Sequence, residues 1–270
     1  MDALANYIEV SNYPNRADHL WRYTSWKRIH PTGEVGNVPV DTKEPRIKLT
    51  NLDGSEVSSG ITLEKGESEK YELPDSDLVT TSFIKAITDK TTWTLKTKHK
   101  FISENPLLLE INAGDDINSL QLNLNIGSLS EFELVTVVKG DTEWMGLLRA
   151  GRIGNGAIIN DIVVGLQEKG TLLRVDAISL GRDAQLTTGT VSSGSEKTKA
   201  DLRYKMGEPG SNLQVLGSIL SRDAMHLDYH IEIQHEAPET FSRLAWHAAC
   251  GGESRTIGTG MLKIAKGSKG

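Results

Sequence analysis

From residue 105 to the C-terminus, apolar and polar residues alternate in short runs. Turns rich in glycine, asparagine, aspartate and serine separate the runs, as at 155–156, 169–170 and 207–210. Because the side chains of a strand point alternately to its two faces, such runs predict strands with one buried face. The predicted strands cover 107–111, 120–126, 132–138, 157–164, 171–178, 184–188, 213–219, 226–233 and 261–264. Many short strands with few helix signals between them are typical of a sandwich, a barrel or a β-helix.

A loose repeat favours the β-helix among these three architectures. A turn, a small residue and an alternating apolar run follow one another at Gly156, at Asp183 and at Asp223. A solenoid needs such a repeat, because each coil buries its apolar face only against the next coil. Closely paired hairpin signals are scarce, which weakens the antiparallel alternatives. We therefore predict a mainly β fold, with a β-helix over residues 105–270.

The first 104 residues have a different pattern and predict a small α+β domain. Leu20, Tyr23 and Trp26 recur at helical spacing, and Asn15 is placed to cap a short helix that begins at Arg16. The further predicted elements are a proline- and glycine-rich loop over 31–45, a strand over 46–50, a helix over 77–87 and a strand over 91–101. The domain boundary is predicted between residues 104 and 105.

Composition narrows the class of protein. The chain has 270 residues, of which 37% are hydrophobic, and its formal net charge is −6. The negative charge argues against nucleic-acid binding as the main task. No apolar run approaches the roughly 18–20 residues that span a bilayer, and the first ten residues lack a secretory signal. We therefore expect a cytoplasmic protein that binds neither membrane nor nucleic acid.

Three segments, in the correct order along the chain, resemble the SufB/SufD family. The block Tyr13-Pro14-Asn15-Arg16, followed by Leu20 to Thr24, is similar to the start of SufD-type proteins. The segment from His235 to Arg243 resembles a family segment with histidine, threonine and serine at this spacing. The run 260–264 is similar to a glycine-led strand of the family at the expected distance.

The resemblance implies a right-handed parallel β-helix preceded by a smaller N-terminal domain. It also implies a role in the SUF machinery, where two such subunits and an ATPase called SufC form a scaffold for iron–sulfur cluster assembly. We therefore expect a non-catalytic scaffold or accessory subunit that holds a cluster only transiently, if at all. Its expected partners are a SufB/SufD-type subunit or a second copy of itself, with a SufC-type ATPase as a further candidate.

The chain departs from the family pattern at its C-terminus. Family members usually continue past the position of Gly270 with further coils, a segment with a cysteine or histidine before glycine, and a helical domain that docks SufC. We therefore expect a short member of the family or a fragment. Cluster ligation by that cysteine or histidine and docking of SufC by the helical domain then do not transfer to this chain. A last coil without a cap exposes strand edges and the apolar run 261–264. For this reason we expect a homodimer or a heterodimer that involves the C-terminal coils.

The histidine-bearing run 226–230 is a candidate metal site. On a strand, His226, Asp228 and His230 lie on one face at spacings of about 7 Å. Imidazole and carboxylate groups are ligands for divalent metals. The alternative is a hydrated polar face of one coil.

Two further residues are candidates for sulfur or cluster handling. His235 lies on the opposite face from His226 and His230, and we expect Thr240 and Ser242 to hydrogen-bond its ring nitrogens. Cys250 is the single cysteine, which excludes an internal disulfide and any all-cysteine site within one chain. Its small neighbours predict a buried, inert thiol with a raised pKa.

The motifs of common enzymes are missing, so we expect no catalysis. The glycines at 151–156 read G-x-x-G-x-G and precede a predicted strand, whereas the dinucleotide fingerprint is G-x-G-x-x-G before a helix. The chain contains neither a P-loop motif nor G-x-S-x-G. The enzymatic alternative is a β-helix polysaccharide lyase or hydrolase, and the other alternative is a pure protein-interaction module. Carboxylates for a lyase would come from residues that we mostly expect in turns, namely Asp161, Asp176, Asp183, Asp201, Asp223 and Asp228.

Overall fold

The computed structural model describes residues 3–9, 12–66, 73 and 77–268. Its strands form two stacked sheets, and the chain alternates between them from β4 onward. Sheet A, in spatial order, contains β15 (Arg255–Ile264), β13 (His226–His235), β11 (Lys197–Met206), β9 (Thr171–Leu180), β7 (Trp144–Ile153), β5 (Ile117–Ile126), β3 (Thr92–Thr97) and β2 (Ile61–Lys65). Sheet B contains β1 (Arg46–Asn51), β4 (Leu107–Ala113), β6 (Glu131–Gly140), β8 (Ile158–Gln167), β10 (Gln185–Ser192), β12 (Asn212–Ser221) and β14 (Phe241–Cys250).

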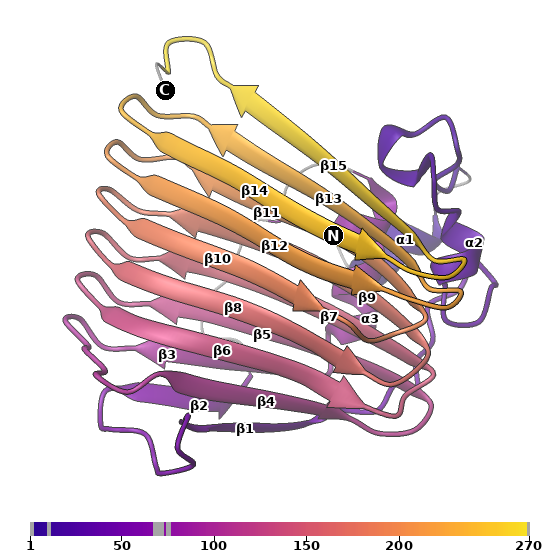
Figure 1. The fold of residues 1–270 in the computed structure, drawn as a ribbon, viewed down its shortest axis with the longest axis horizontal. Coiled ribbons are helices and arrows are strands. Elements are labelled where there is room, and N and C mark those ends of the chain that lie inside the picture. The colour runs from indigo at the N-terminus through magenta and orange to yellow at the C-terminus, as the bar shows by residue number, and fades with distance from the viewer. Residues whose placement is uncertain (1–2, 10–11, 67–72, 74–76, 269–270) are drawn as a thin grey trace.

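The two sheets are the two walls of a right-handed solenoid. All neighbouring strands pair in parallel except β1 with β4 and β2 with β3, which close one end with antiparallel pairs. Figure 1 shows β4 to β14 of sheet B in front, running to the right, and β5 to β15 of sheet A behind, running to the left, with the chain rising from β4 to β15. This winding confirms the predicted right-handed parallel β-helix.

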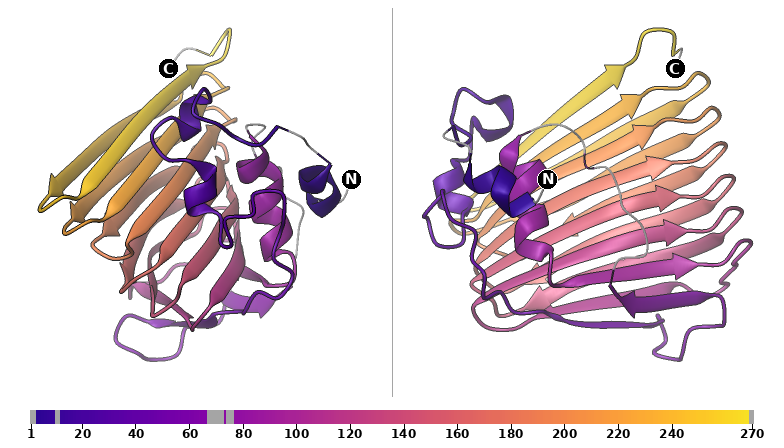
Figure 2. Two further views of the ribbon diagram at one scale, coloured as in Figure 1. Left: turned by 90° about the vertical axis from the view of Figure 1, so that its right-hand side faces the viewer. Right: turned by 180° about the vertical axis from the view of Figure 1, so that it is seen from behind.

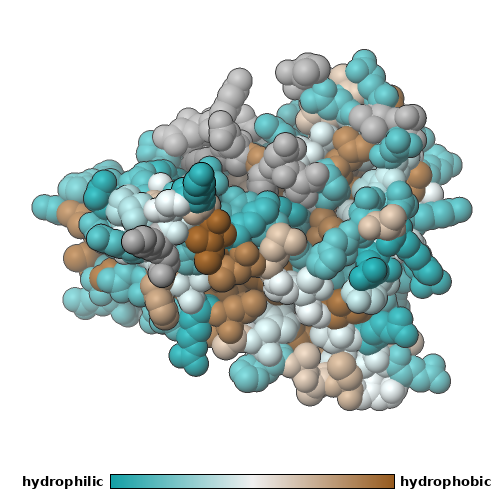
Figure 3. Space-filling model, turned by 90° about the horizontal axis from the view of Figure 1, so that it is seen from above, coloured by the Kyte–Doolittle hydropathy of each residue, from teal (hydrophilic) through white to brown (hydrophobic). Residues whose placement is uncertain are grey.

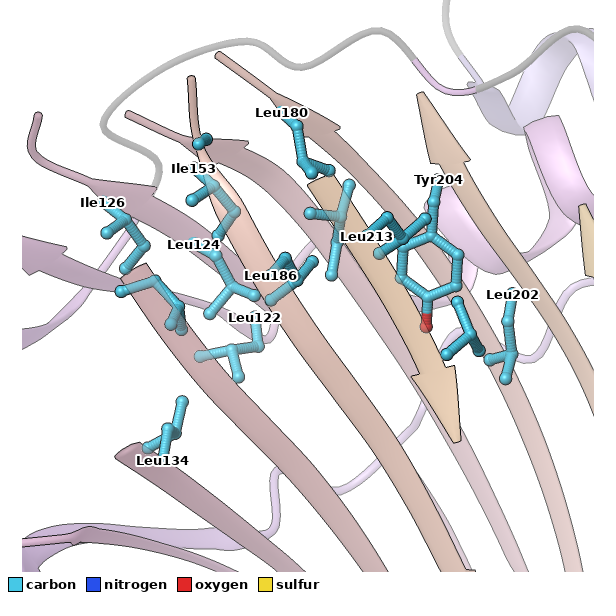
Figure 4. Packing of buried hydrophobic residues seen from close by; sticks show 14 of the residues in the cluster. Leu122, Leu124, Ile126, Leu134, Ile153, Leu180, Leu186, Leu202, Tyr204 and Leu213 are labelled. Carbon is cyan, nitrogen blue, oxygen red and sulfur yellow. The ribbon is translucent and has the colours of Figure 1, made fainter. Parts of the chain in front are cut away.

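Aliphatic side chains fill the space between the sheets. Figure 4 shows Leu122, Leu124 and Leu202 of sheet A meeting Leu134, Leu186 and Leu213 of sheet B. These side chains are at most 3% exposed, as expected for strands that each bury one face in a shared core. The turns at Asp183 and Asp223 use positive φ values of 56° and 55°, which aspartate tolerates better than most residues.

The sequence pattern missed four strands of the two sheets, namely β2, β7, β11 and β14. β7 contains Gly146 and Gly151, which weaken a strand signal. β11 does alternate charged residues with inward residues, so its own pattern would have predicted a strand there, whereas β14 carries a mixed pattern without clear alternation. The other predicted strands are present, with shifted ends.

Short N-terminal helices cover part of the outer face of sheet A, on the side where its strands begin (Figure 2). They are α1 (Ala3–Ile8), the 3₁₀ turn η1 (His19–Trp21), α2 (Trp26–Ile29), the π-helical turn η2 (Val79–Phe83) and α3 (Ile84–Thr88). Tyr7 and Trp26 pack there against Phe83 in edge-to-face ring contacts, and Phe83 also meets Trp144 of β7 edge to face. The helix predicted over 77–87 corresponds to η2 and α3. None of the described helices is long and apolar enough to cross a membrane.

The helix predicted from Arg16 through Trp26 is wrong. The chain forms η1 and then turns to an extended conformation at Ser25 before α2 begins. Trp21, which lies outside the helical spacing of Leu20, Tyr23 and Trp26, is buried, whereas Tyr23, which belongs to that spacing, is 54% exposed. Contacts with sheet A decide which aromatic rings are buried, and these contacts override the helical spacing.

The predicted division between residues 104 and 105 stays a prediction. β1, β2 and β3 precede that boundary and pair with β4, with each other and with β5 in the two sheets of the solenoid. The helices before the boundary share one apolar cluster with β7 and β9.

Candidate functional site

A ladder of charged side chains lies on the outer face of β11 and β13, where the N-terminal segments cover sheet A. The parallel register places Lys199 beside Asp228, Asp201 beside His230, and Arg203 beside Glu232. We call these six residues the outer charged cluster. Each of them is at most 6% exposed. Alternation directs Ala200, Leu202 and Tyr204 of the same strand into the solenoid, so the charges must face outward.

Lys199 joins the N-terminal segment to the sheet. Its Nζ lies 3.0 Å from Asp228 Oδ2 and donates a hydrogen bond of 2.5 Å to the carbonyl of Leu20. It also lies 5.3 Å from the ring centroid of Trp21, a distance at which a cation is attracted to an aromatic face. A buried ammonium is tolerated because these partners replace its lost water.

Thr24 connects the same segment to β13. Its hydroxyl donates to the Asp228 carboxylate, and its oxygen lies 2.8 Å from His226 Nε2. Because the one hydroxyl proton goes to Asp228, His226 donates from Nε2 to the threonine oxygen. Burial lowers the pKa of His226, and the nearby Asp228 charge opposes this shift.

Asp201 is held by three neighbours at once. Thr80 Oγ1 lies 2.8 Å from Oδ2, Arg203 Nε donates to Oδ2 at 2.9 Å, and His230 Nδ1 lies 2.9 Å from Oδ1. Burial alone would raise the pKa of Asp201, but the His230 hydrogen bond and the Arg203 charge hold it below its usual value. The carboxylate is therefore ionised at neutral pH.

Glu232 ends the ladder near the surface. Arg203 Nη1 donates to it at 2.7 Å, and Lys263 Nζ of β15 lies 2.9 Å from it. Burial raises its pKa, whereas hydrogen bonds from Gln234 and Lys263 and the charge of Arg203 lower it, with a net decrease. With Lys263, the ladder sets three cations against the three carboxylates Asp201, Asp228 and Glu232. The charges balance, and the arrangement holds the N-terminal segments against the solenoid.

A second group of charged side chains, not predicted from the sequence, lies inside the solenoid. Arg149 of β7 donates two hydrogen bonds of 2.7 Å to Asp161 of β8 and one of 2.9 Å to Asp176 of β9. Arg174 donates two further hydrogen bonds of 2.9 and 2.6 Å to Asp176 and one of 3.1 Å to Thr190 Oγ1. We call these four charged residues the inner charged cluster. The available signal was a charge at an inward position within strands whose other inward residues are apolar.

Residues 150–270 match the family model described as SUF system FeS cluster assembly, SufBD core domain. This part of the chain is a SufBD core domain. The match confirms the resemblance to the SufB/SufD family and a part in iron–sulfur cluster assembly. The matched range contains β8 to β15, and hence the whole outer charged cluster. None of the curated proteins searched matches the chain.

The three predicted metal candidates share one face of the SufBD core domain. His226, Asp228 and His230 all lie on the outer side of β13, as their alternation predicted. Each one already has a protein partner, namely Thr24, Lys199 or Asp201. Within the described residues no three histidine, cysteine, aspartate or glutamate side chains are grouped so that they could hold a metal ion. Metal binding by this row stays a prediction.

The predicted hydrogen bonds of His235 are confirmed. Its Nδ1 lies 2.7 Å from Thr240 Oγ1 and its Nε2 lies 2.8 Å from Ser242 Oγ. The two hydroxyls tie the end of β13 to the start of β14 across the connecting turn. Burial lowers the pKa of His235, so the neutral ring is the form that this site favours.

The expectation that Cys250 is buried is wrong. Its thiol is exposed, because β14 is the edge strand of sheet B in the described structure. Hydrogen bonds with Ser221 and Thr256 lower the pKa of Cys250, where burial was expected to raise it. The thiol is thus accessible and has more thiolate character than an unperturbed cysteine.

The expectation that most of the aspartates lie in turns is also wrong. Only Asp183 and Asp223 of the six take turn positions with positive φ. The other four are at most 3% exposed and are paired with arginine, lysine or histidine, which explains how strands accommodate them: Asp161, Asp176, Asp201 and Asp228. These four carboxylates do not line an open groove of the kind that a polysaccharide lyase needs.

Proposed function

We propose that this protein is a non-catalytic scaffold or accessory subunit of the SUF system. The observation that carries the proposal is the SufBD core domain over residues 150–270. The site supports a structural task, because the carboxylates and cations of the outer charged cluster are engaged with one another. Groups bound in this way hold segments together and are poorly placed to attack or protonate a substrate.

The proposed partners are a SufB/SufD-type subunit or a second copy, together with a SufC-type ATPase. Pairing through the C-terminal coils is part of this proposal. Leu244 of β14 and Leu262 and Ile264 of β15 are 41%, 57% and 57% exposed. Figure 3 looks onto this end of the solenoid from above and shows hydrophobic residues gathered in its middle. Apolar side chains of this kind favour burial against another chain.

The proposed cofactor state is an iron–sulfur cluster that is held only transiently. One exposed thiol, Cys250, cannot by itself complete the four-thiolate ligand set that common clusters use. Cluster work would therefore need ligands from a partner. Cys250 and His235 remain the candidates for contributing to such a shared site.

Anaerobic reconstitution followed by absorption spectroscopy tests this function. The protein alone should show little or no stable cluster, whereas co-expression with a SufB-type subunit and a SufC-type ATPase should yield a co-purifying complex. A stable stoichiometric cluster on the isolated chain would contradict the transient role. Cleavage of acidic polysaccharides by the purified protein would instead support the enzymatic alternative.

A further inference from the structure

The outer face of sheet B carries exposed and half-buried apolar residues across five neighbouring strands. The register aligns one residue from each of β6, β8, β10, β12 and β14 in a single row: Val135, Ile162, Gly189, Leu216 and Ala245. Ile162 and Leu216 of this row are 37% and 39% exposed, and Val191 and Leu220, two and four positions further along their strands, are 41% and 50% exposed. We call this surface the sheet B face.

The outer faces of the two sheets differ in how far other segments of the chain cover them. The short helices and aromatic rings of the N-terminal segments cover part of the outer face of sheet A, whereas Figure 1 shows the sheet B face open toward the viewer among the described residues. Parallel sheets are normally covered on both faces, because their strands are apolar on both. An open apolar face of this extent marks an interaction surface.

A groove runs through the middle of the sheet B face. It has a volume of about 510 Å³, and Gly189 lies between the side chains of Ile162 and Leu216. The lining is predominantly apolar, with Val135 and Val191 among its residues. Such a surface, with ridges beside a hollow, suits interdigitation with another apolar sheet face.

Charge is distributed asymmetrically across this face. The neighbouring row reads Glu133, Asn160, Thr187, Gln214 and Arg243, so it is acidic on β6, uncharged in the middle and basic on β14. Glu131 adds to the acidic side, the outward Lys139 of β6 is paired with Glu110 of β4, and His247 lies on the basic side. Both Glu133 and Arg243 are exposed.

We propose that a second copy of this chain packs on the sheet B face around a twofold axis that runs parallel to the strands over β10. Such an axis places β6 of one copy over β14 of the other. Glu133 then faces Arg243 of the second copy twice, and Ile162 faces Leu216 of the second copy twice beside the Gly189 hollow. A twofold interface must be self-complementary in this way.

The available area fits a stable interface. Five strands of up to ten residues cover about 24 by 33 Å, or about 800 Å², at the usual strand spacing and rise. A standard interface buries about 800 Å² on each partner. A partner of single-sign charge would leave one side of the row unpaired, which is why a second copy fits better. This contact is separate from pairing through the C-terminal coils, which would use the edges of β14 and β15.

Charge-reversal variants of the chain, measured by sedimentation at micromolar concentration, test the proposal. E133R alone and R243E alone should each weaken self-association through the sheet B face by about tenfold or more, because each creates two like-charge contacts. The double variant E133R/R243E should restore that self-association, because the pairs re-form with their signs exchanged. L216K should abolish the self-association, whereas the matched reversal R222E in an exposed turn should leave it unchanged. A chain that stays monomeric, or an association that all of these variants leave unchanged, overturns the proposal.

Cross-linking provides a measurement that is independent of affinity. In a Cys250→Ser background, Gly189→Cys places a thiol next to the proposed axis. A short bismaleimide should then link two copies efficiently, whereas Arg222→Cys should give few linked dimers. Equal linking at both positions, or none at position 189, argues against the twofold contact.

Discussion

Arg149 of β7 donates hydrogen bonds of 2.7 Å to both carboxylate oxygens of Asp161 of β8, and this pair joins the two sheets inside the solenoid. Both side chains are almost completely removed from water. The same guanidinium reaches Asp176 of the neighbouring coil. A buried ion pair of this geometry fixes how the two sheets face each other, and its loss would leave an uncompensated charge.

Replacing Asp161 by alanine should therefore destabilise the fold strongly. We expect the free energy of unfolding to fall by about 3–5 kcal/mol, the usual cost of breaking a buried pair by removing one partner. Urea unfolding followed by circular dichroism measures it. The matched variant D141A removes the exposed partner of Lys169 and should cost at most about 1 kcal/mol. Equal losses in the two variants would contradict a special role for the inner charged cluster.

Replacing Lys199 by methionine should loosen the N-terminal segment. The variant leaves Asp228 without its cation and removes the hydrogen bond to Leu20, and we expect a loss of about 3–5 kcal/mol. Trypsin should then cut faster after Arg22, Lys27 or Arg28, as mass spectrometry of the fragments would show. The matched variant K205M affects a lysine that is half exposed on the same face and should leave the cleavage rate unchanged. Unchanged cleavage in K199M would show that the aromatic contacts alone hold the segment.

Stability should decrease as the pH falls below about 6.5, the ordinary pKa of histidine. Burial lowers the pKa of His30, His226 and His235 in the folded chain, so the unfolded chain binds more protons in this range. The free energy of unfolding then falls by up to about 1.4 kcal/mol per pH unit for each such histidine, until the pH passes the folded pKa.

Thermal or urea unfolding between pH 7 and pH 5 measures this slope. H235Q should reduce it, because glutamine does not take up a proton, whereas H99Q at an exposed position should not. The acidic groups with lowered pKa, Asp201 and Glu232, lose their stabilising charge only at lower pH. A slope that is identical in H235Q and in the unmodified chain would contradict the contribution of His235.

Cys250 should react readily with iodoacetamide in the native protein. Its thiol is exposed, and hydrogen bonds with Ser221 and Thr256 lower its pKa. S221A should raise that pKa and slow alkylation at neutral pH, because the thiolate is the reacting form. The pH dependence of alkylation, followed by mass spectrometry, gives the pKa of the thiol and its alkylation rate at neutral pH, with S193A as the control. A thiol that reacts only after denaturation would contradict its exposure.

The sequence by itself determined the class of fold. Alternation in short runs and the repeat at Gly156, Asp183 and Asp223 predicted a β-helix, because each coil must bury one side of each strand. The same alternation placed His226, Asp228 and His230 on one face, and the local spacing of Thr240 and Ser242 predicted the hydrogen bonds of His235. These features depend on neighbours within one strand or one turn.

Only the tertiary structure decided which partner each charged residue meets. Asp201 and His230 are 29 positions apart, and Lys199 and Leu20 are 179 apart, so their pairing depends on strand register and on where the N-terminal segment lies. The exposure of Cys250 depends in the same way on the place of β14 at the edge of sheet B. Burial is a property of the assembled sheets, because a side chain loses water only when another element covers it.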